Sequence, residues 1–182
     1  MESNQLLKVK LIAAILYQTD EALSEVYQLL EKGFSPIDIK GSYFPFQVSD
    51  YYEPEMGPNL KRGIISFEEL IHPGKLAESK LKSRELEQLL ADDGNRRVNI
   101  DIGYLDIYKV VLASFKGRSN KIYMSDGIWA DIVLVFEKGD FSTLNWGFPD
   151  FKSGIYNETF LAIRNRYKDQ LKEIRTKGQA EE

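Results

Sequence analysis

Apolar runs and amphipathic segments alternate along the first half of the chain. The run KVKLIAAILY has the length and apolar content of a buried strand. Thr19 then offers a helix N-cap, apolar side chains recur at helical spacing, and Gly33 can end the helix. Two strands, a second helix and a short strand follow. The predicted elements are, in order, residues 8–17, 19–33, 36–44, 60–67, 74–91 and 96–101.

That order, βαββαβ, is the ferredoxin-like arrangement, in which both helices cover one face of an antiparallel sheet. We expect the strand from Lys8 to Leu16 to be central. From Tyr104 to Phe115 the apolar spacing predicts a further helix, although VVLASF also has strand propensity. A meander and a last helix follow, at residues 121–124, 128–136, 141–146 and 157–174.

The predicted fold class is therefore α+β. A ferredoxin-like βαββαβ core is extended by a helix, a three-stranded antiparallel meander and a C-terminal helix. We expect a single domain over residues 1–175, followed by a polar tail at residues 176–182.

Composition narrows the functional classes. The 182 residues are 43% hydrophobic and 29% charged, which suits a folded core rather than disorder. A formal net charge of -4 argues against general binding of nucleic acid or of an acidic membrane surface. The chain has no cysteine, which excludes disulfides and thiolate chemistry and suits a reducing compartment. It has no signal-peptide core and no run of about 18 apolar residues, so we expect a cytoplasmic protein that does not span a membrane.

The usual catalytic motifs are absent from the sequence. There is no GxxxxGK[ST] phosphate loop, no GxGxxG after a strand and no GxSxG elbow. The single histidine, His72, excludes an HExxH zinc site and argues against a histidine-based triad. Any catalysis would use carboxylates, lysine, tyrosine or a bound metal, and the sequence leaves open whether the protein is an enzyme.

A long aromatic and charged connection, YFPFQVSDYYEPEMGPNLKR, separates the second and third predicted strands. Connections of this length and composition are commonly binding loops or lids. Tyr51 and Tyr52 can stack on a ligand, while Asp50 and Glu53 can offer oxygen ligands to Mg²⁺. The competing interpretation is a solvated acidic loop whose tyrosines only pack.

Basic residues accompany the third and fourth predicted strands. Strand alternation places Arg97, Asn99 and Asp101 on one face of the fourth strand. In a ferredoxin-like sheet only the first strand separates the fourth from the third, so Lys61 and Arg62 can approach this face. Three bases on one face would bind a phosphate or carboxylate. The alternative is a structural network in which Arg97 pairs with Asp101 or with the acids of the loop.

Two further features invite either a structural or a functional interpretation. Asp131 lies among apolar neighbours in a predicted strand, which indicates a core ion pair with Lys121 or Arg118, or else a functional acid. The run WGFPDF is typical of a packing plug between parts of a domain, and alternatively of a platform that stacks a base.

The leading hypothesis is binding of a small phosphorylated or carboxylated ligand, with Mg²⁺ as an optional cofactor. The proposed ligand-binding residues are Lys61, Arg62, Arg97, Asn99, Asp101, Tyr51 and Tyr52, and the proposed metal ligands are Asp50 and Glu53. The alternative is a non-catalytic protein–protein interaction module that uses the aromatic loop and WGFPDF on a protein partner or a second copy. Nucleic acid is not an expected partner.

A set of motifs spread along the chain resembles one known family. In order they are FPFQVSDYYEPEMG, LKRGIISFEEL, LAESKLKSRELE, RRVNIDIGYL, KIYM, GIWADIVL and WGFPDF. Together they resemble the prokaryotic family catalogued as domain of unknown function 4416, over about Leu7 to Leu171. The family has no established activity, so the resemblance implies none. The resemblance supports the choice of the candidate site residues named above, but it implies no role for them.

Overall fold

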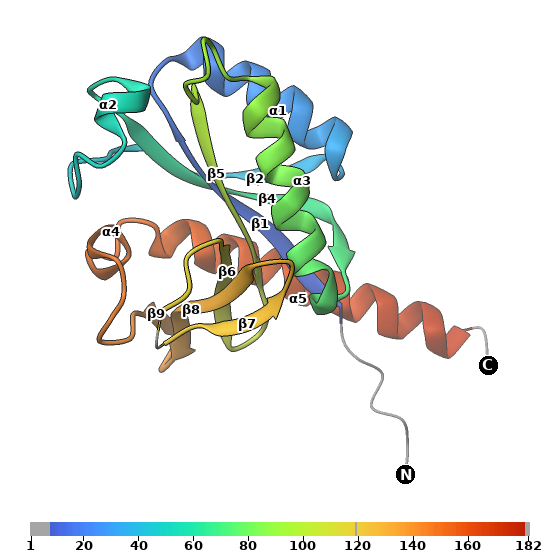
Figure 1. The fold of residues 1–182 in the computed structure, drawn as a ribbon. Helices are drawn as coiled ribbons and strands as arrows, with labels where there is room; N and C mark the ends of the chain where they lie inside the picture. The colour runs from blue at the N-terminus through green and yellow to red at the C-terminus, as the bar shows by residue number, and fades with distance from the viewer. Residues whose placement is uncertain (1–7, 119, 181–182) are drawn as a thin grey trace.

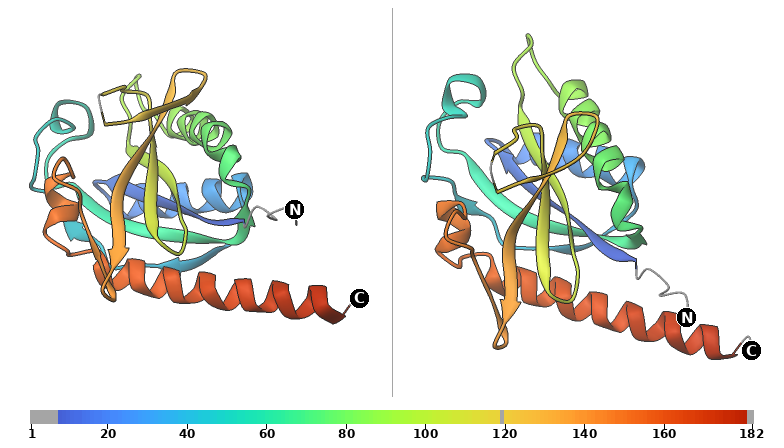
Figure 2. Two further views of the ribbon diagram at one scale, coloured as in Figure 1. Left: turned by 90° about the horizontal axis from the view of Figure 1, so that it is seen from below. Right: turned by 60° about the horizontal axis from the view of Figure 1, so that its bottom comes forward.

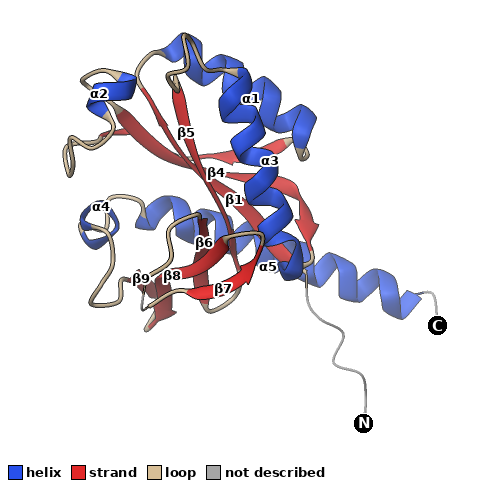
Figure 3. Cartoon of the chain, viewed as in Figure 1, coloured by secondary structure: helices blue, strands red, loops and turns tan. Residues whose placement is uncertain are grey.

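A computed structural model describes residues 8–118 and 120–180 of the chain. Over these residues the protein is α+β, with five α-helices and one antiparallel sheet of nine strands (Figures 1 and 3). The strands are Val9–Tyr17 (β1), Ile37–Lys40 (β2), Phe44–Pro45 (β3), Lys61–Ile71 (β4), Val98–Leu105 (β5), Lys109–Ser114 (β6), Ile122–Ser125 (β7), Ile128–Glu137 (β8) and Asp140–Ser142 (β9). The helices are Asp20–Gly33 (α1), Glu53–Met56 (α2), Leu76–Leu89 (α3), Pro149–Lys152 (α4) and Asn157–Ala180 (α5).

The strand order places β1 at the centre of the first half of the chain. The sheet runs β2-β4-β1-β5-β6-β8-β7, with β3 paired to β4 and β9 paired to β8. All nine residues of β1 are buried, and the strand pairs antiparallel with β4 on one side and β5 on the other. The predicted central strand is thus confirmed. The predicted meander is also confirmed, because β8 pairs antiparallel with both β7 and β9.

Alternating side chains of β1 supply two hydrophobic cores. Leu11, Ala13 and Ile15 pack under α1 and α3, whereas Ile12 and Ala14 face the side that α5 covers. Figure 2 shows α5 running below the sheet and α3 above it. From Leu11 to Tyr17 the strand has no charged residue, because helices bury both of its faces.

Helix α1 begins and ends where its sequence signals lie. The Thr19 side chain accepts a hydrogen bond of 3.2 Å from the Ala22 backbone N–H, as an N-cap does. Asp20 and Glu21 occupy the first turn, where the helix dipole favours negative charge. The helix ends at Gly33, as predicted.

The prediction of a helix from Tyr104 to Phe115 is wrong. Its first residues complete β5, and Lys109–Ser114 forms β6. Between them Asp106 accepts hydrogen bonds of 2.7 and 2.8 Å from the backbone N–H groups of Tyr108 and Lys109, which closes a tight turn. Residues 110–113 are all buried, so both faces of this run are covered. Apolar residues therefore occupy successive positions, and their spacing does not distinguish a strand from one face of a helix. The run VVLASF, whose strand propensity favoured the alternative, lies in this strand and the residues after it.

Helix α3 covers an open edge of β5. Strands β5 and β6 pair only over Gly103 to Leu105, which leaves the first part of β5 unpaired on that side. Lys80 donates a hydrogen bond of 2.9 Å to the Ile100 carbonyl, and Glu87 accepts one from the Ile100 N–H. Both side chains are buried. They satisfy backbone groups that would otherwise lie exposed at a strand edge.

A pH-dependent stability follows from the position of Glu87. Burial raises the pKa of this carboxyl above its usual value of 4.5. A raised folded-state pKa contributes stability that is present below the unfolded pKa and lost as pH rises through the folded value. Glu87→Gln keeps an acceptor for Ile100 and cannot ionise, so the variant should gain stability relative to the wild type as pH rises above 4.5.

Urea unfolding of the Glu87→Gln variant and of the wild type, at several pH values between 4.5 and 7, measures this difference directly. Glu85→Gln, at an exposed position of the same helix, controls for the lost charge. A difference between Glu87→Gln and the wild type that stays flat or falls with rising pH would contradict the expectation.

Helix α5 is tied to the sheet by polar contacts as well as by its apolar face. The Tyr167 hydroxyl donates to the Lys8 carbonyl at 2.6 Å, and the Gln170 amide donates to the Glu68 carbonyl at 2.6 Å. Lys10, fully buried beneath the helix, pairs with Asp38 and donates to Gln170 at 2.8 Å, and burial lowers its pKa. The helix continues to Ala180, beyond its predicted end. No helix in the described ranges combines the length and apolarity needed to cross a membrane.

Candidate functional site

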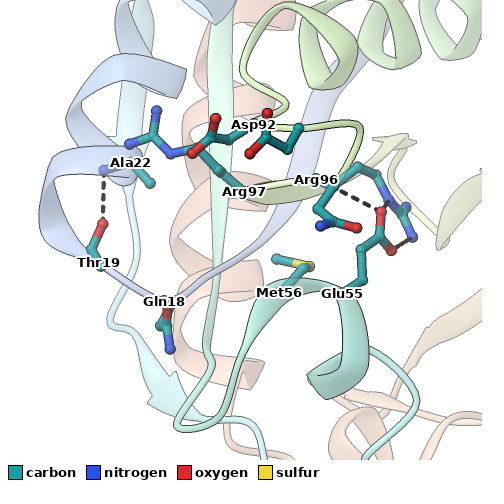
Figure 4. A pocket seen from close by; sticks show the side chains of 10 residues that line it. Gln18, Thr19, Ala22, Glu55, Met56, Asp92, Arg96 and Arg97 are labelled. Atoms are coloured by element: carbon teal, nitrogen blue, oxygen red, sulfur yellow. Dashed lines mark hydrogen bonds and ion pairs between the residues drawn. The ribbon is translucent and has the colours of Figure 1, made fainter.

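A cavity of about 270 Å³ lies at the end of the sheet where β1 turns into α1 (Figure 4). Three segments form its walls: the turn before α1, the end of α2, and the turn of residues 92–97 that leads into β5. Its charged lining side chains are Glu55, Asp92, Asp93, Arg96 and Arg97. Because β4, β1 and β5 are adjacent in the sheet, these loops meet at one end although they are far apart in the sequence.

Arg97 lies on the α1 side of the cavity. Its guanidinium donates to the two Glu25 carboxylate oxygens at 2.6 and 3.4 Å, and the side chains are 35% and 41% exposed. Hydrogen bonding to Glu25 raises the pKa of Arg97. Strand β5 begins at Val98, so Arg97 precedes the strand that was predicted to carry it. This pairing separates it from Arg62, which it was expected to meet.

Arg96 forms the opposite wall and was not singled out from the sequence. It donates to Glu55 through Nε at 2.8 Å and through Nη2 at 2.7 Å, and its backbone N–H adds a bond of 3.0 Å. A third side-chain bond of 2.9 Å reaches the buried Asn99. Figure 4 shows the side chains of Arg96 and Arg97 diverging. The hydrogen bonds from Arg96 lower the pKa of Glu55, and the pair fastens α2 to the start of β5.

Arg62 and Asp101, two of the proposed ligand-binding residues, pair with each other, and Arg62 also pairs with Asp150. The Arg62 guanidinium donates to Asp101 at 2.6 Å and to Asp150 of α4 at 3.0 Å. It lies between the rings of Phe46 and Phe151, about 5.5 and 5.4 Å from their centroids. The Arg62 side chain is 9% exposed and that of Asp150 is 4% exposed, so this cation is held inside the protein.

The Arg62 cluster, comprising Arg62, Asp101 and Asp150, extends to its neighbours. Lys80 lies 3.8 Å from Asp101. Tyr52 is partly buried, and its pKa is raised to about 12 by burial and then by the charge of Asp101. Asp150 could have been suspected from the sequence, because a lone carboxylate inside WGFPDF requires a partner once that segment is buried.

Tyr51 does not share the position of Tyr52. It is 60% exposed, and its hydroxyl accepts a hydrogen bond of 2.9 Å from Lys116 in the loop after β6. This bond lowers the pKa of Tyr51. The two rings pack edge to face with their centroids 5.0 Å apart, although Tyr51 is exposed and Tyr52 is partly buried. That they cover a ligand together stays a prediction.

The remaining predicted site residues lie outside the cavity. Lys61 is exposed and lies 3.7 Å from exposed Asp20. Asp50 and Glu53 are also exposed. Within residues 8–118 and 120–180, no group of three or more histidine, aspartate or glutamate side chains is placed to hold a metal ion. A magnesium site at Asp50 and Glu53 stays a prediction.

The two features with competing interpretations are now placed. Asp131 is buried and pairs at 3.4 Å with Lys121, whose side chain is 7% exposed, and this is the predicted core ion pair. In WGFPDF, Phe151 is buried and packs on α5, whereas Trp146 and Phe148 are 55% and 45% exposed. The end of this segment thus packs in the core, as the first interpretation requires, whereas Trp146 and Phe148 face solvent.

Comparison with known proteins agrees with the resemblance seen in the motifs. The family model described as Domain of unknown function (DUF4416) matches residues 7–167. The chain belongs to this family. No curated protein matches the chain, and no solved structure does. The DUF4416 match spans the cavity and the Arg62 cluster, but its description gives no activity, so the function has to be argued from the geometry.

Proposed function

We propose that this protein binds a small anionic ligand, phosphorylated or carboxylated, in the cavity at the end of the sheet. The observation that carries the proposal is that one space of about 270 Å³ is lined by Arg97 and by Thr19 and Ala22 of the α1 N-terminus. A guanidinium has five N–H donors, and Glu25 accepts only two hydrogen bonds from this one. The remaining donors can hold a phosphate or carboxylate oxygen.

Partial exposure of the Arg97–Glu25 pair supports this role. Exposed ion pairs contribute only about 0–1 kcal/mol, so a ligand can share or replace Glu25 at little cost. The Arg62 cluster offers no such freedom, because its guanidinium is buried against two carboxylates. In this proposal Arg97 anchors the ligand. Arg62, Asn99, Asp101 and Tyr52 do not line the cavity, and Asn99 is connected to it through its hydrogen bond with Arg96.

The proposal predicts that anionic ligands raise the melting temperature only when Arg97 is present. Wild-type protein should be stabilised by at least one of inorganic phosphate, a sugar phosphate, a nucleotide or a small organic acid in a thermal-shift screen. Arg97→Gln should remove most of that shift, because it removes the charged anchor. Lys61→Gln removes a cation that lies outside the cavity and should keep the shift.

Two outcomes would contradict this assignment. One is the lack of any shift in the wild type across all four ligand classes. The other is an equal shift in Arg97→Gln and wild type.

We also infer that the first half of the chain is a ferredoxin-like unit. The support is the order β2-β4-β1-β5, the antiparallel direction of each pair, and the packing of α1 and α3 on one face. Strands β6 to β9 and α5 are additions to it. A cytoplasmic location is part of the proposal, since a chain without cysteine suits a reducing compartment.

The second candidate function, a protein–protein interaction module, is favoured by the exposed aromatic side chains Trp146 and Phe148. Exposed aromatic residues are common anchors in protein interfaces. This alternative requires no stabilisation by a small anion, so the same thermal-shift screen separates it from the ligand proposal.

A further inference from the structure

A second cavity, of about 240 Å³, lies at the opposite end of α1 from the first. Helices α1 and α3 lie side by side on one face of the sheet (Figure 1). The end of α1, the first turns of α3, the start of β1 and the end of β4 form the cavity. It shares no described lining residue with the first cavity, so the two are separate candidate sites.

The sheet and the end of α1 give this second cavity an apolar side. Leu11 of β1, Ile71 of β4 and Phe34 after α1 line it, and Leu11 is only 2% exposed. The Phe34 ring packs against the buried ring of Phe67, with their centroids 5.4 Å apart. Apolar parts of a ligand would lose contact with water here, which favours binding.

Helix α3 gives the cavity a polar side. Lys75, Ser79 and Lys82 follow the i, i+4, i+7 spacing of one helix face, and all three line the cavity. The Lys82 ammonium lies 5.3 Å from the centroid of the Phe34 ring and forms no ion pair with any described residue. Lys75 pairs with Glu78 at 2.6 Å, but the two side chains are 61% and 70% exposed, so a ligand can replace Glu78 at little cost.

Ser79 is the buried polar residue of this cavity that has no partner within the protein. It is 7% exposed. The other buried polar side chains of α3 each form a hydrogen bond with a backbone group; these are Lys80, Ser83 and Glu87. The Ser79 hydroxyl forms no hydrogen bond with any residue in the ranges 8–118 and 120–180. Because a buried hydroxyl without a partner is unfavourable, a ligand that bonds to Ser79 gains more than it would at an exposed serine.

We propose that this second cavity binds a short amphipathic carboxylate. The carboxylate accepts a hydrogen bond from the Ser79 hydroxyl and pairs with Lys82. The hydrocarbon tail packs against Leu11, Phe34 and Ile71. At about 240 Å³ the cavity is smaller than the pockets of about 300–1,000 Å³ that hold drug-sized ligands, so the tail is expected to have only a few carbons.

The charges around Ser79 favour an anion over a cation. Two lysines flank Ser79 on its own helix, and Ser79 lies near the N-terminal end of α3, where the helix dipole favours negative charge. Glu69 is an opposing charge in the lining, but it belongs to β4 and is exposed to solvent. The sign of the ligand charge is therefore part of the test.

Titration with hexanoate, followed by NMR of amide and methyl groups, measures the affinity and locates the site. Hexanoate should bind about tenfold or more tightly than acetate, which lacks the tail. It should bind about fivefold or more tightly than 1-hexanol, which lacks the charge. Hexylamine should bind no more tightly than 1-hexanol. The shifted signals should include the methyl groups of Leu11 and Ile71.

Substitutions on α3 separate binding from folding. Ser79→Ala and Lys82→Gln should each weaken hexanoate binding about fivefold. Ser79→Ala should leave the urea midpoint unchanged or raise it, because the hydroxyl has no hydrogen bond within the described protein to lose. Lys32→Gln is the matched control, because Lys32 is an exposed lysine in the last turn of α1 that does not line the cavity. It should keep the wild-type affinity, and so should Arg97→Gln.

Three outcomes would overturn this proposal. The first is equal affinity of the wild type for hexanoate and acetate, which would mean that no tail is buried. The second is tighter binding of hexylamine than of hexanoate, which would mean that Glu69 sets the preferred charge. The third is loss of hexanoate binding in Arg97→Gln but not in Lys82→Gln, which would place the ligand in the first cavity and support the proposed function instead. The first two leave that function to the separate thermal-shift screen.

Discussion

Replacing Arg62 with alanine is expected to lower the free energy of unfolding by about 3–5 kcal/mol. The substitution leaves Asp101 and Asp150 without the guanidinium that each contacts, at 2.6 and 3.0 Å. Asp150 is 4% exposed and cannot recover its hydration without displacing α4. Removing one partner of a buried pair is costly because the remaining charge stays buried. Urea unfolding followed by circular dichroism measures the loss.

Lys61→Ala is the matched control for this substitution. Lys61 is adjacent in sequence, but its side chain is 46% exposed and lies 3.7 Å from an exposed carboxylate. Its loss should change the free energy of unfolding by no more than about 0.5 kcal/mol. A loss below about 1 kcal/mol for Arg62→Ala would show that the cluster is solvated in solution, and would reopen the role of Arg62 in binding a ligand.

Phe160→Ala is expected to lower the free energy of unfolding by about 3–5 kcal/mol. Phe160 is fully buried on α5 and packs against the rings of Phe141 and Phe151, with centroid separations of 5.7 and 6.1 Å. Truncation removes apolar contacts and leaves a cavity between the helix and the sheet. Thermal or urea unfolding of the variant measures the effect and tests whether α5 belongs to the folding unit.

Ile174→Ala on the same helix provides the comparison. Ile174 is 52% exposed and lies after the buried Leu171, so its loss should stay within about 0.5 kcal/mol. Equal effects of the two substitutions would mean that α5 does not dock as described. A two-step unfolding curve for Phe160→Ala would instead mean that α5 and the sheet unfold separately.

The ion pairs of this protein fall into two groups, buried and solvent-exposed, which have different roles. Buried pairs such as Arg62–Asp150 and Lys121–Asp131 hold strands and helices together. Exposed pairs such as Arg97–Glu25 can exchange partners at low cost. Arg96 connects the groups, because its bonds to Glu55 and Asn99 form both a cavity wall and a tie between α2 and β5.

Some features of the site were accessible from the sequence. Arg62 and Asp101 were expected near each other on two strands that only β1 separates, and they do form a pair. The structural network expected as the alternative paired Asp101 with Arg97, whereas Asp101 pairs with Arg62. Lys61 and Arg97 were expected beside them but lie with Asp20 and Glu25 instead. Alternation predicts the face on which a residue lies only within a strand, and Arg97 lies before the first residue of β5.

Local signals determined the elements near the start of the chain. The apolar run of β1, the Thr19 cap and Gly33 at the end of α1 depend on neighbours within a few residues, and all three lie as predicted. Asp131 likewise required a partner wherever its strand was buried, and Lys121 supplies it. These features follow from residue types and their spacing over a short stretch of chain, and both can be read from the sequence.

Only the tertiary structure decided the rest. Whether Tyr104 to Phe115 becomes a helix or a strand depends on burial of both faces of the run, which other segments of the sheet supply. The partners of Arg62 lie 39 and 88 residues away in the sequence. Many carboxylates along the chain are equally suitable partners for an arginine. Which one it meets depends on the packing of α4 and β5 around it, because ion pairs form wherever the fold brings opposite charges together.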